Sequence, residues 1–158
     1  MYNILFVCTG NICRSPIAEF LFKDLIIKND LSHKLNAKSA GLGAWNGLPA
    51  ADFTLLVGKE NGLDLESHRS QSINFNLIHE SDLILGMAYQ HKNEMQRMFP
   101  QYLSKIETIR EFNISNVSSI DIDDPYGRNY KIYKRIFKEI QNEIFRIWPA
   151  IRRNGIMK

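Results

Sequence analysis

The most constraining stretch of this chain lies at its beginning, where an apolar run is followed by a short polar loop and a second, amphipathic run. The apolar run covers residues 4–7 and predicts a buried parallel strand, and the amphipathic run covers residues 17–26 and predicts a helix. Ser15 is predicted to be the N-cap of this helix, with Pro16 at its first position. The chain therefore turns directly from a strand into a helix.

The loop between these elements begins at Cys8 and ends at Arg14. A tight turn into a helix directs backbone N–H groups inward, and the helix N-terminus adds further free donors and a positive dipole end, so the turn forms a cradle for an anion. A thiol in such a field, beside an arginine, favours the thiolate form. A thiolate beneath a bound phosphoryl group is a nucleophile, so the loop predicts attack on phosphorus.

The rest of the chain alternates between apolar strand patterns and helical patterns. Buried strands are predicted over residues 35–40, 82–87 and 105–109, and helices from Pro49 to about Gly62, over residues 89–99 and along the stripe from Ile132 to Trp148. This alternation predicts an α/β fold of three layers, a four-stranded parallel sheet with helices on both faces. Ligands bind such sheets at the carboxyl ends of the strands, which is where the Cys8 loop begins.

Length and composition predict one domain over residues 1–158. The net charge of +3 comes without a long basic run, so no nucleic-acid partner is expected, and Arg152 and Arg153 are predicted to lie in a solvated basic tail from about residue 150. Cys8 and Cys13 are the two cysteines, which leaves none for a structural disulfide. With no signal peptide and no apolar stretch of bilayer length, we expect a cytoplasmic protein without a membrane partner.

The pattern Cys8, five residues, then Arg14-Ser15-Pro16, directly after the first strand, resembles the low-molecular-weight protein tyrosine phosphatase family. The resemblance implies hydrolysis of phosphotyrosine through a phosphocysteine intermediate formed on Cys8. Arg14 and the backbone amides of the loop would hold the phosphate oxygens, and the Ser15 hydroxyl would donate to the thiolate. The loop residues implied to bind substrate in this way are Thr9, Gly10, Asn11, Ile12 and Cys13.

Asp124 is the predicted general acid and base, because Asp124-Pro125-Tyr126-Gly127 resembles the acid loop of the family. Turn chemistry alone would make this segment a scaffold. The neighbouring carboxylates Asp123 and Asp121 stay open as second and third candidates.

The resemblance also places Trp45 and Tyr126 at the rim, where two aromatic walls would favour phosphotyrosine over shorter phosphoserine. Asn11 is predicted to adopt a left-handed conformation. Its side chain would be tied to Ser15, Ser39 and His68, which serve as structural support.

Cys13 is implied to pair reversibly with Cys8 under oxidation, and a plain buried thiol is the alternative. His33, His79 and His91 have no spacing that indicates a metal site or a catalytic base. No metal and no cofactor is therefore expected.

Three other functions compete with this prediction. Thiol-relay arsenate reductases resemble the family, but they use further cysteines downstream, and this chain has none after Cys13. Protein arginine phosphatases are closer, although they favour threonine where this loop has Ile12. A non-catalytic phosphate-binding or redox-sensing module is the third. The implied partners are phosphotyrosine proteins and a cognate tyrosine kinase, with the chain a monomer or weak dimer.

Overall fold

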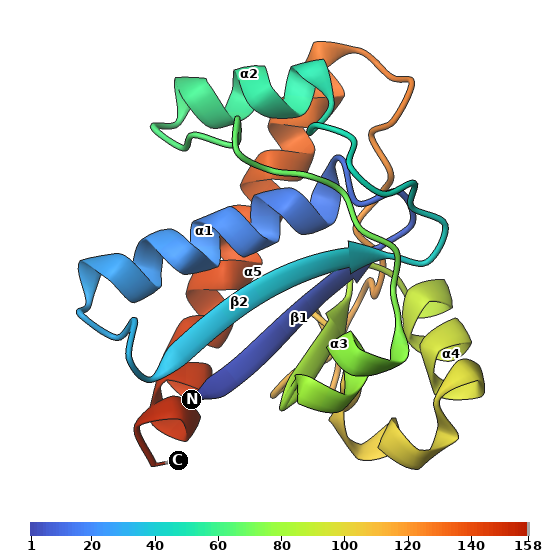
Figure 1. The fold of residues 1–158 in the computed structure, drawn as a ribbon. Coiled ribbons are helices and arrows are strands. Elements are labelled where there is room, and N and C mark those ends of the chain that lie inside the picture. The colour runs from blue at the N-terminus through green and yellow to red at the C-terminus, as the bar shows by residue number, and fades with distance from the viewer. Residues whose placement is uncertain (158) are drawn as a thin grey trace.

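Figure 1 shows a computed structural model that describes residues 1–157. Its sheet contains β1 (Tyr2–Cys8), β2 (Leu35–Gly41), β3 (Leu83–Gly86) and β4 (Ile106–Thr108). All neighbouring strands are parallel, in the order β2-β1-β3-β4, with Ile4 of β1 opposite Ala37 of β2 and Leu83 of β3. The predicted four-stranded parallel sheet is confirmed.

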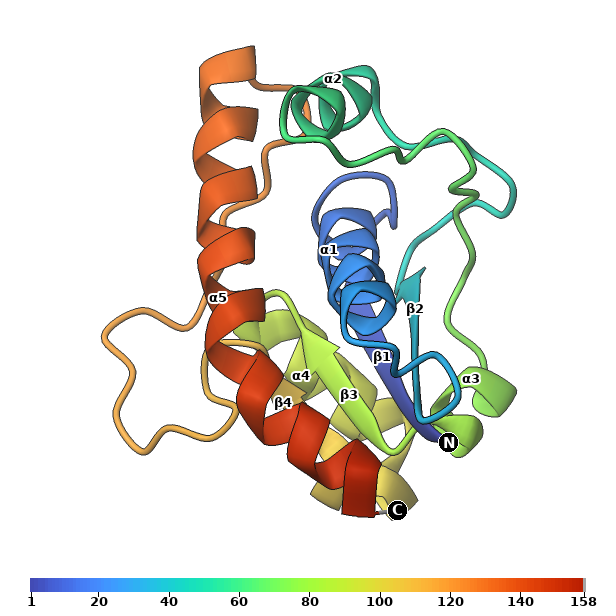
Figure 2. The ribbon, with the colours of Figure 1, turned by 90° about the vertical axis from the view of Figure 1, so that its left-hand side faces the viewer.

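Helices cover both faces of this sheet, as predicted. Figures 1 and 2 show α1 and α5 on one face and α3 and α4 on the other. The helical segments are α1 (Arg14–Lys28), α2 (Asp52–Glu60), α3 (Phe75–Glu80), α4 (Tyr89–Met98), the 3₁₀ helix η1 (Pro100–Lys105) and α5 (Tyr130–Met157). No helix within residues 1–157 combines the length and the apolar character needed to cross a bilayer.

The position of β1 in the sheet explains why its residues 4–7 are all apolar. Ile4 and Phe6 point into the core formed with α1 and α5, whereas Leu5 and Val7 point into the core formed with α3 and α4. Each side chain of this run is buried, because a central parallel strand has helices on both sides. For the same reason, no side chain of residues 4–7 faces the solvent.

Two predicted helix starts are wrong. Helix α1 begins at Arg14, with Cys13 at the cap position and no side-chain capping bond, so Ser15 is not the N-cap. The Ser15 hydroxyl instead bonds within the loop that precedes the helix. Helix α2 begins at Asp52 rather than at Pro49.

The basic tail predicted from about residue 150 is also wrong. Helix α5 continues to Met157, and its buried stripe continues with it, because Ile147, Ile151 and Gly155 follow one another at four-residue spacing and are all buried. A side chain at Gly155 would meet Leu35 at the start of β2. The basic side chains in this segment lie on the exposed face of a packed helix.

The winding of the chain places the functional edge of the sheet. β1 lies between β2 and β3, so the chain moves to one side of β1 first and then to the other. In a parallel α/β sheet this reversal leaves a crevice at the carboxyl ends of the strands. The loops that follow β1, β2, β3 and β4 all emerge at this edge (Figure 1).

Replacing Ile151 tests whether the last turns of α5 are packed. Ile151→Ala should lower the free energy of unfolding by about 2–4 kcal/mol, because Ile151 is fully buried. Arg152→Ala, one residue along and exposed, is the matched control and should change it by about 0.5 kcal/mol or less. Urea denaturation of both variants measures the difference. Equal, small effects would indicate a solvated tail.

Candidate active site

A cavity of about 270 Å³ opens at the carboxyl end of β1. It brings together the loop after β1, the segment after β2 and the loop that precedes α5. The predicted nucleophile, arginine, acid and aromatic rim all line it, although Asp124 lies more than a hundred residues from Cys8 in the sequence. The lining residues are Cys8, Thr9, Gly10, Ile12, Cys13, Arg14, Gly43, Trp45, Leu48, Asp124 and Tyr126.

Asn11 shapes the loop. Its φ of 56° lies in the left-handed region, as predicted, and asparagine tolerates this region better than most residues. The conformation directs the Asn11 N–H toward the Cys8 Sγ atom, 3.3 Å away. A backbone donor therefore faces the sulfur from within the loop.

The Ser15 hydroxyl is the second polar group beside that sulfur. The Ser15 Oγ atom lies 2.9 Å from the Cys8 Sγ atom and accepts a hydrogen bond of 2.9 Å from the Asn11 side-chain amide. The single hydrogen of the Ser15 hydroxyl has two nearby acceptors, the Cys8 sulfur at 2.9 Å and the Ala40 carbonyl oxygen at 3.5 Å, and the contact with the sulfur is the shorter. Hydrogen bonds to the charged form of a thiol favour that form.

A buried polar network holds Asn11 in place. Its side-chain amide donates to Ser39 at 2.8 Å as well as to Ser15, and its Oδ1 atom accepts from the backbone of Gln71 at 2.9 Å. The backbone oxygen of Asn11 lies 2.7 Å from the His68 Nε2 atom. The structure thus brings Ser39 and His68 beneath the loop rather than into the cavity.

Arg14 links the loop to the segment that carries the candidate acids. Its Nη1 atom donates to the carbonyl of Ile122 at 2.9 Å, and its Nη2 atom lies 3.4 Å from the Asp124 carboxylate. The Nε atom is buried and has no hydrogen-bond partner among residues 1–157. A buried N–H without an acceptor is costly, and an anion in the adjoining cavity would supply one.

The three candidate carboxylates have different partners. Asp124 lines the cavity, half-exposed, and accepts from the backbone of Tyr126 at 3.1 Å. Asp123 pairs with Arg135 at 2.9 Å, and Asp121 accepts from the backbone of Tyr89 at 2.7 Å. Neither of these two lines the cavity, so the geometry favours Asp124.

Trp45 and Tyr126 stand at the mouth of the cavity, with 79% and 67% of their surfaces exposed. The backbone oxygen of Trp45 accepts from the Ser70 hydroxyl. Large exposed aromatic side chains beside a polar cavity floor are suited to stacking on a ring that enters it.

The second cysteine of the loop has a different partner from the first. Cys13 is buried, as Cys8 is, and its Sγ atom lies 3.5 Å from the Tyr133 hydroxyl. Burial raises the pKa of Cys13 to about 11, so its thiol stays protonated at neutral pH. Both cysteines are free in this structure.

Nothing in the sequence indicated that His91, a residue of helix α4, contacts the loop that follows β1. Its Nε2 atom lies 3.0 Å from the Thr9 Oγ1 atom, and the ring is 1% exposed. Burial, assisted by the positive charge of Arg14, lowers the pKa of His91 to about 4, although Asp124 and Asp121 act in the opposite direction. His91 is therefore neutral at physiological pH. A polar residue at the third position of a helix carries no signal that could have revealed this contact.

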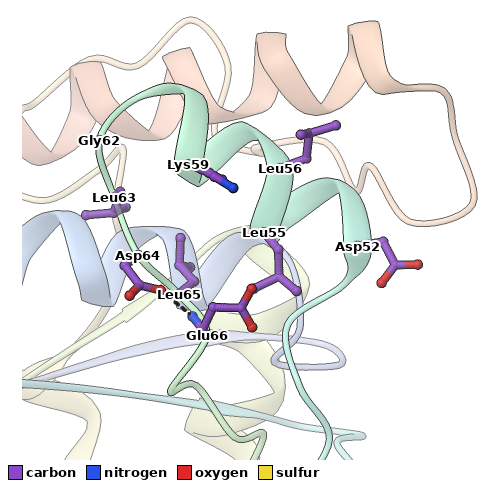
Figure 3. A pocket seen from close by; sticks show the side chains of 9 residues that line it. All are labelled: Asp52, Leu55, Leu56, Lys59, Gly62, Leu63, Asp64, Leu65 and Glu66. Carbon is purple, nitrogen blue, oxygen red and sulfur yellow. Dashed lines mark hydrogen bonds between the residues drawn. The ribbon is translucent and has the colours of Figure 1, made fainter.

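A larger cavity, of about 600 Å³, lies between α2 and residues 62–66. Figure 3 shows that its side chains are mostly leucines and carboxylates, with Lys59 as the single basic group. It holds no cysteine, arginine or histidine, and its carboxylates repel a phosphate group. The smaller cavity is therefore the candidate active site.

No set of three or more His, Cys, Asp or Glu side chains within residues 1–157 is arranged to hold a metal ion.

The buried histidine makes stability depend on pH. The folded protein keeps His91 neutral down to about pH 4, whereas an unfolded chain protonates it near 6.5, so proton uptake in this window favours unfolding. The free energy of unfolding should therefore fall as the pH is lowered from 6.5 to 4, by about 3 kcal/mol from this group. Burial also lowers the pKa of His68, which adds to the same trend.

Urea denaturation at pH 7 and pH 4.5 measures this contribution. His91→Gln should reduce the difference between the two pH values by roughly 2–3 kcal/mol relative to the original chain. His33→Gln, at an exposed histidine, is the matched control and should keep the original difference. An unchanged difference in the His91 variant would contradict the assignment.

Comparison with known proteins gives a consistent result. The family model described as low molecular weight phosphotyrosine protein phosphatase matches residues 3–156. A probable low molecular weight protein-tyrosine-phosphatase of Ralstonia solanacearum, EpsP, is 33% identical, covering 97% of this chain and 98% of that protein. A protein-arginine-phosphatase of Bacillus subtilis is 32% identical, covering 96% and 98%.

The fold agrees with these similarities. A solved low molecular weight protein tyrosine phosphatase from T. tengcongensis superposes with a TM-score of 0.86 at 36% identity, covering 95% of this chain and 99% of that one. This chain therefore resembles these phosphatases in both sequence and fold, and its cavity contains a cysteine and an arginine. The chain belongs to the low molecular weight phosphotyrosine protein phosphatase family, a family of enzymes.

Proposed function

We propose that this enzyme hydrolyses phosphotyrosine in proteins through a phosphocysteine intermediate. One observation carries the proposal: the Cys8 sulfur lies 2.9 Å from the Ser15 hydroxyl oxygen and accepts from the Asn11 backbone N–H at 3.3 Å, in a cavity that also holds Arg14 and Asp124. Donors that converge on a sulfur favour the thiolate, which is the nucleophilic form.

In the first step the Cys8 thiolate attacks phosphorus in line with the phenolic oxygen. The S–P bond forms as the P–O bond to tyrosine breaks, and Asp124 donates its proton to the leaving oxygen. Arg14 and the loop N–H groups hold the three remaining phosphoryl oxygens, on which negative charge is greatest. The unpartnered Arg14 Nε atom supports this assignment.

In the second step a water molecule attacks the phosphocysteine. Asp124, now a carboxylate, takes a proton from the water as its oxygen bonds to phosphorus, the S–P bond breaks, and inorganic phosphate leaves. The Cys8 thiolate is regenerated, with the Ser15 hydroxyl 2.9 Å from the sulfur. One carboxylate serves both steps because the leaving oxygen and the attacking water occupy the same side of the phosphorus.

The walls of the cavity support a preference for phosphotyrosine. Trp45 and Tyr126 stand at its mouth, above a floor that includes Ile12. The phenyl ring of phosphotyrosine is long enough to pass between aromatic walls and bring its phosphate to the floor, and phosphoserine is shorter. We further propose that residues 1–158 form one phosphatase domain and that its substrate proteins are cytoplasmic. We expect the chain to be a monomer or a weak dimer.

A protein arginine phosphatase is the second candidate, because a relative of similar identity carries that name. Its guanidinium substrate is planar and polar, and a polar side chain on the floor would suit it better than an aliphatic one. The side chain of Ile12, which lines the cavity, is entirely apolar. A non-catalytic phosphate-binding or redox-sensing module is less favoured, because binding alone requires neither a thiolate nor an acid.

A matched set of peptides tests the reaction and the substrate together. Peptides of one sequence that carry phosphotyrosine, phosphoserine or phosphoarginine should differ in kcat/KM, with phosphotyrosine fastest by about 100-fold or more. Ile12→Thr should reduce the difference in kcat/KM between the phosphotyrosine and phosphoarginine peptides. Cys8→Ser should still bind the phosphotyrosine peptide but lose turnover by about 10⁴-fold or more. Faster phosphoarginine hydrolysis would assign the second candidate, and binding without any turnover would assign the module.

The acid is tested by leaving groups of different basicity. Asp124→Asn should slow aryl phosphates with basic leaving groups by about 10²–10⁴-fold and those with acidic leaving groups far less, because only the former need a proton. Asp123→Asn is the matched control, since Asp123 pairs with Arg135 outside the cavity, and it should stay within about 3-fold of the original rate. Equal slowing of every substrate by Asp124→Asn would show that another group supplies the proton.

A further inference from the structure

The Thr9 side chain is held by a histidine that the proposed mechanism leaves unused. Thr9 is exposed and lines the cavity beside Cys8, and its Oγ1 atom lies 3.0 Å from the His91 Nε2 atom. No other hydrogen bond of the Thr9 hydroxyl is formed with residues 1–157. The contact joins helix α4 to the phosphate loop.

The surroundings of the buried His91 ring favour one direction for this hydrogen bond. The His91 Nδ1 atom is buried and has no partner in the described part of the chain. A neutral imidazole carries one N–H, and a buried N–H without an acceptor costs more than a bare ring nitrogen. This favours the tautomer with the hydrogen on Nε2, in which the ring donates to Thr9 Oγ1. In that tautomer the Thr9 hydroxyl hydrogen has no acceptor among residues 1–157.

We propose that the Thr9 hydroxyl donates a hydrogen bond to an oxygen of the bound phosphoryl group, and that His91 is the positioning residue that turns it there. This inference rests on the proposed phosphate-binding role of the loop. It adds a side-chain donor to the ring of backbone amides and Arg14, and it gives the buried histidine a function.

The surroundings of both residues restrict them to this arrangement. The Thr9 backbone oxygen accepts from the Gly43 N–H at 2.9 Å, which anchors the residue from the side of β2 while His91 holds it from the side of β3. Gly86 at the end of β3 leaves room for the histidine, because a Cβ atom at Gly86 would lie 3.0 Å from the His91 Cβ atom. Thr9 is thus held on both flanks, with its hydroxyl hydrogen free.

Inorganic phosphate is the probe, and its affinity is measured by isothermal titration calorimetry alongside kcat/KM for an aryl phosphate. Thr9→Val, which keeps the shape and removes the hydroxyl, should weaken phosphate binding and kcat/KM by about 10-fold or more. Thr9→Ser retains the hydroxyl and should stay within about 3-fold.

Substitutions at His91 test the positioning role. His91→Leu should lower phosphate affinity and kcat/KM by about 3- to 10-fold. His91→Gln, which can place an amide N–H near the Nε2 position, should restore most of that loss. In the double variant Thr9→Val/His91→Leu, both quantities should stay within about 2-fold of their values in Thr9→Val alone, because His91 acts only through the Thr9 hydroxyl. A general packing role of His91 would instead give losses that multiply. Circular dichroism at 25 °C checks that each variant is folded.

The outcomes separate this inference from the proposed function. Phosphate affinity that falls as expected in a protein without phosphotyrosine turnover would support the hydroxyl contact and overturn the function. Normal turnover with unchanged phosphate affinity in Thr9→Val would overturn the contact. Losses that multiply in the double variant would overturn the positioning role of His91.

Discussion

The architecture of the site depends on one asparagine in a left-handed conformation. Asn11 points its backbone N–H at the Cys8 sulfur because its φ is positive, and its side chain holds Ser15 and Ser39 together while it accepts from the Gln71 backbone. Each of these bonds is buried or partly buried, where an unmet donor is costly. Glycine would also accept the conformation, but it has no side chain to donate to Ser15 and Ser39 and to accept from the Gln71 backbone.

The fold turns this local arrangement into a cavity. β1 is the strand at which the winding of the sheet reverses, so loops from β2, β3 and β4 meet around its end. The segment with the acid is fastened twice, by Ile122 N–H to the carbonyl of Met87 after β3 and by Arg14 to the carbonyl of Ile122. Arg14, the proposed phosphate ligand, thus also holds the segment that carries Asp124, the proposed acid.

The two cysteines of the loop lie in different surroundings. Both sulfurs are buried, but Cys8 lies 2.9 Å from the Ser15 hydroxyl and accepts from the Asn11 N–H, whereas Cys13 lies near the Tyr133 hydroxyl, and burial raises the pKa of Cys13. The Cys13 thiol stays protonated at neutral pH, and the Cys8 sulfur faces polar groups of the loop. The two residues are of one type and both are buried, so they differ in their hydrogen-bond partners.

The sequence alone determined what depends on neighbours along the chain: the buried strand, the loop from Cys8 to Arg14, the left-handed Asn11 and the alternation that makes a parallel sheet. Only the tertiary structure placed Asp124, and neither Asp121 nor Asp123, on the lining of the cavity, brought His91 against Thr9, and packed Ile151 and Gly155 where a solvated tail was predicted. These outcomes depend on residues that are distant in sequence. Local propensity and spacing describe one segment at a time, whereas hydrogen-bond partners and burial are set only when segments meet.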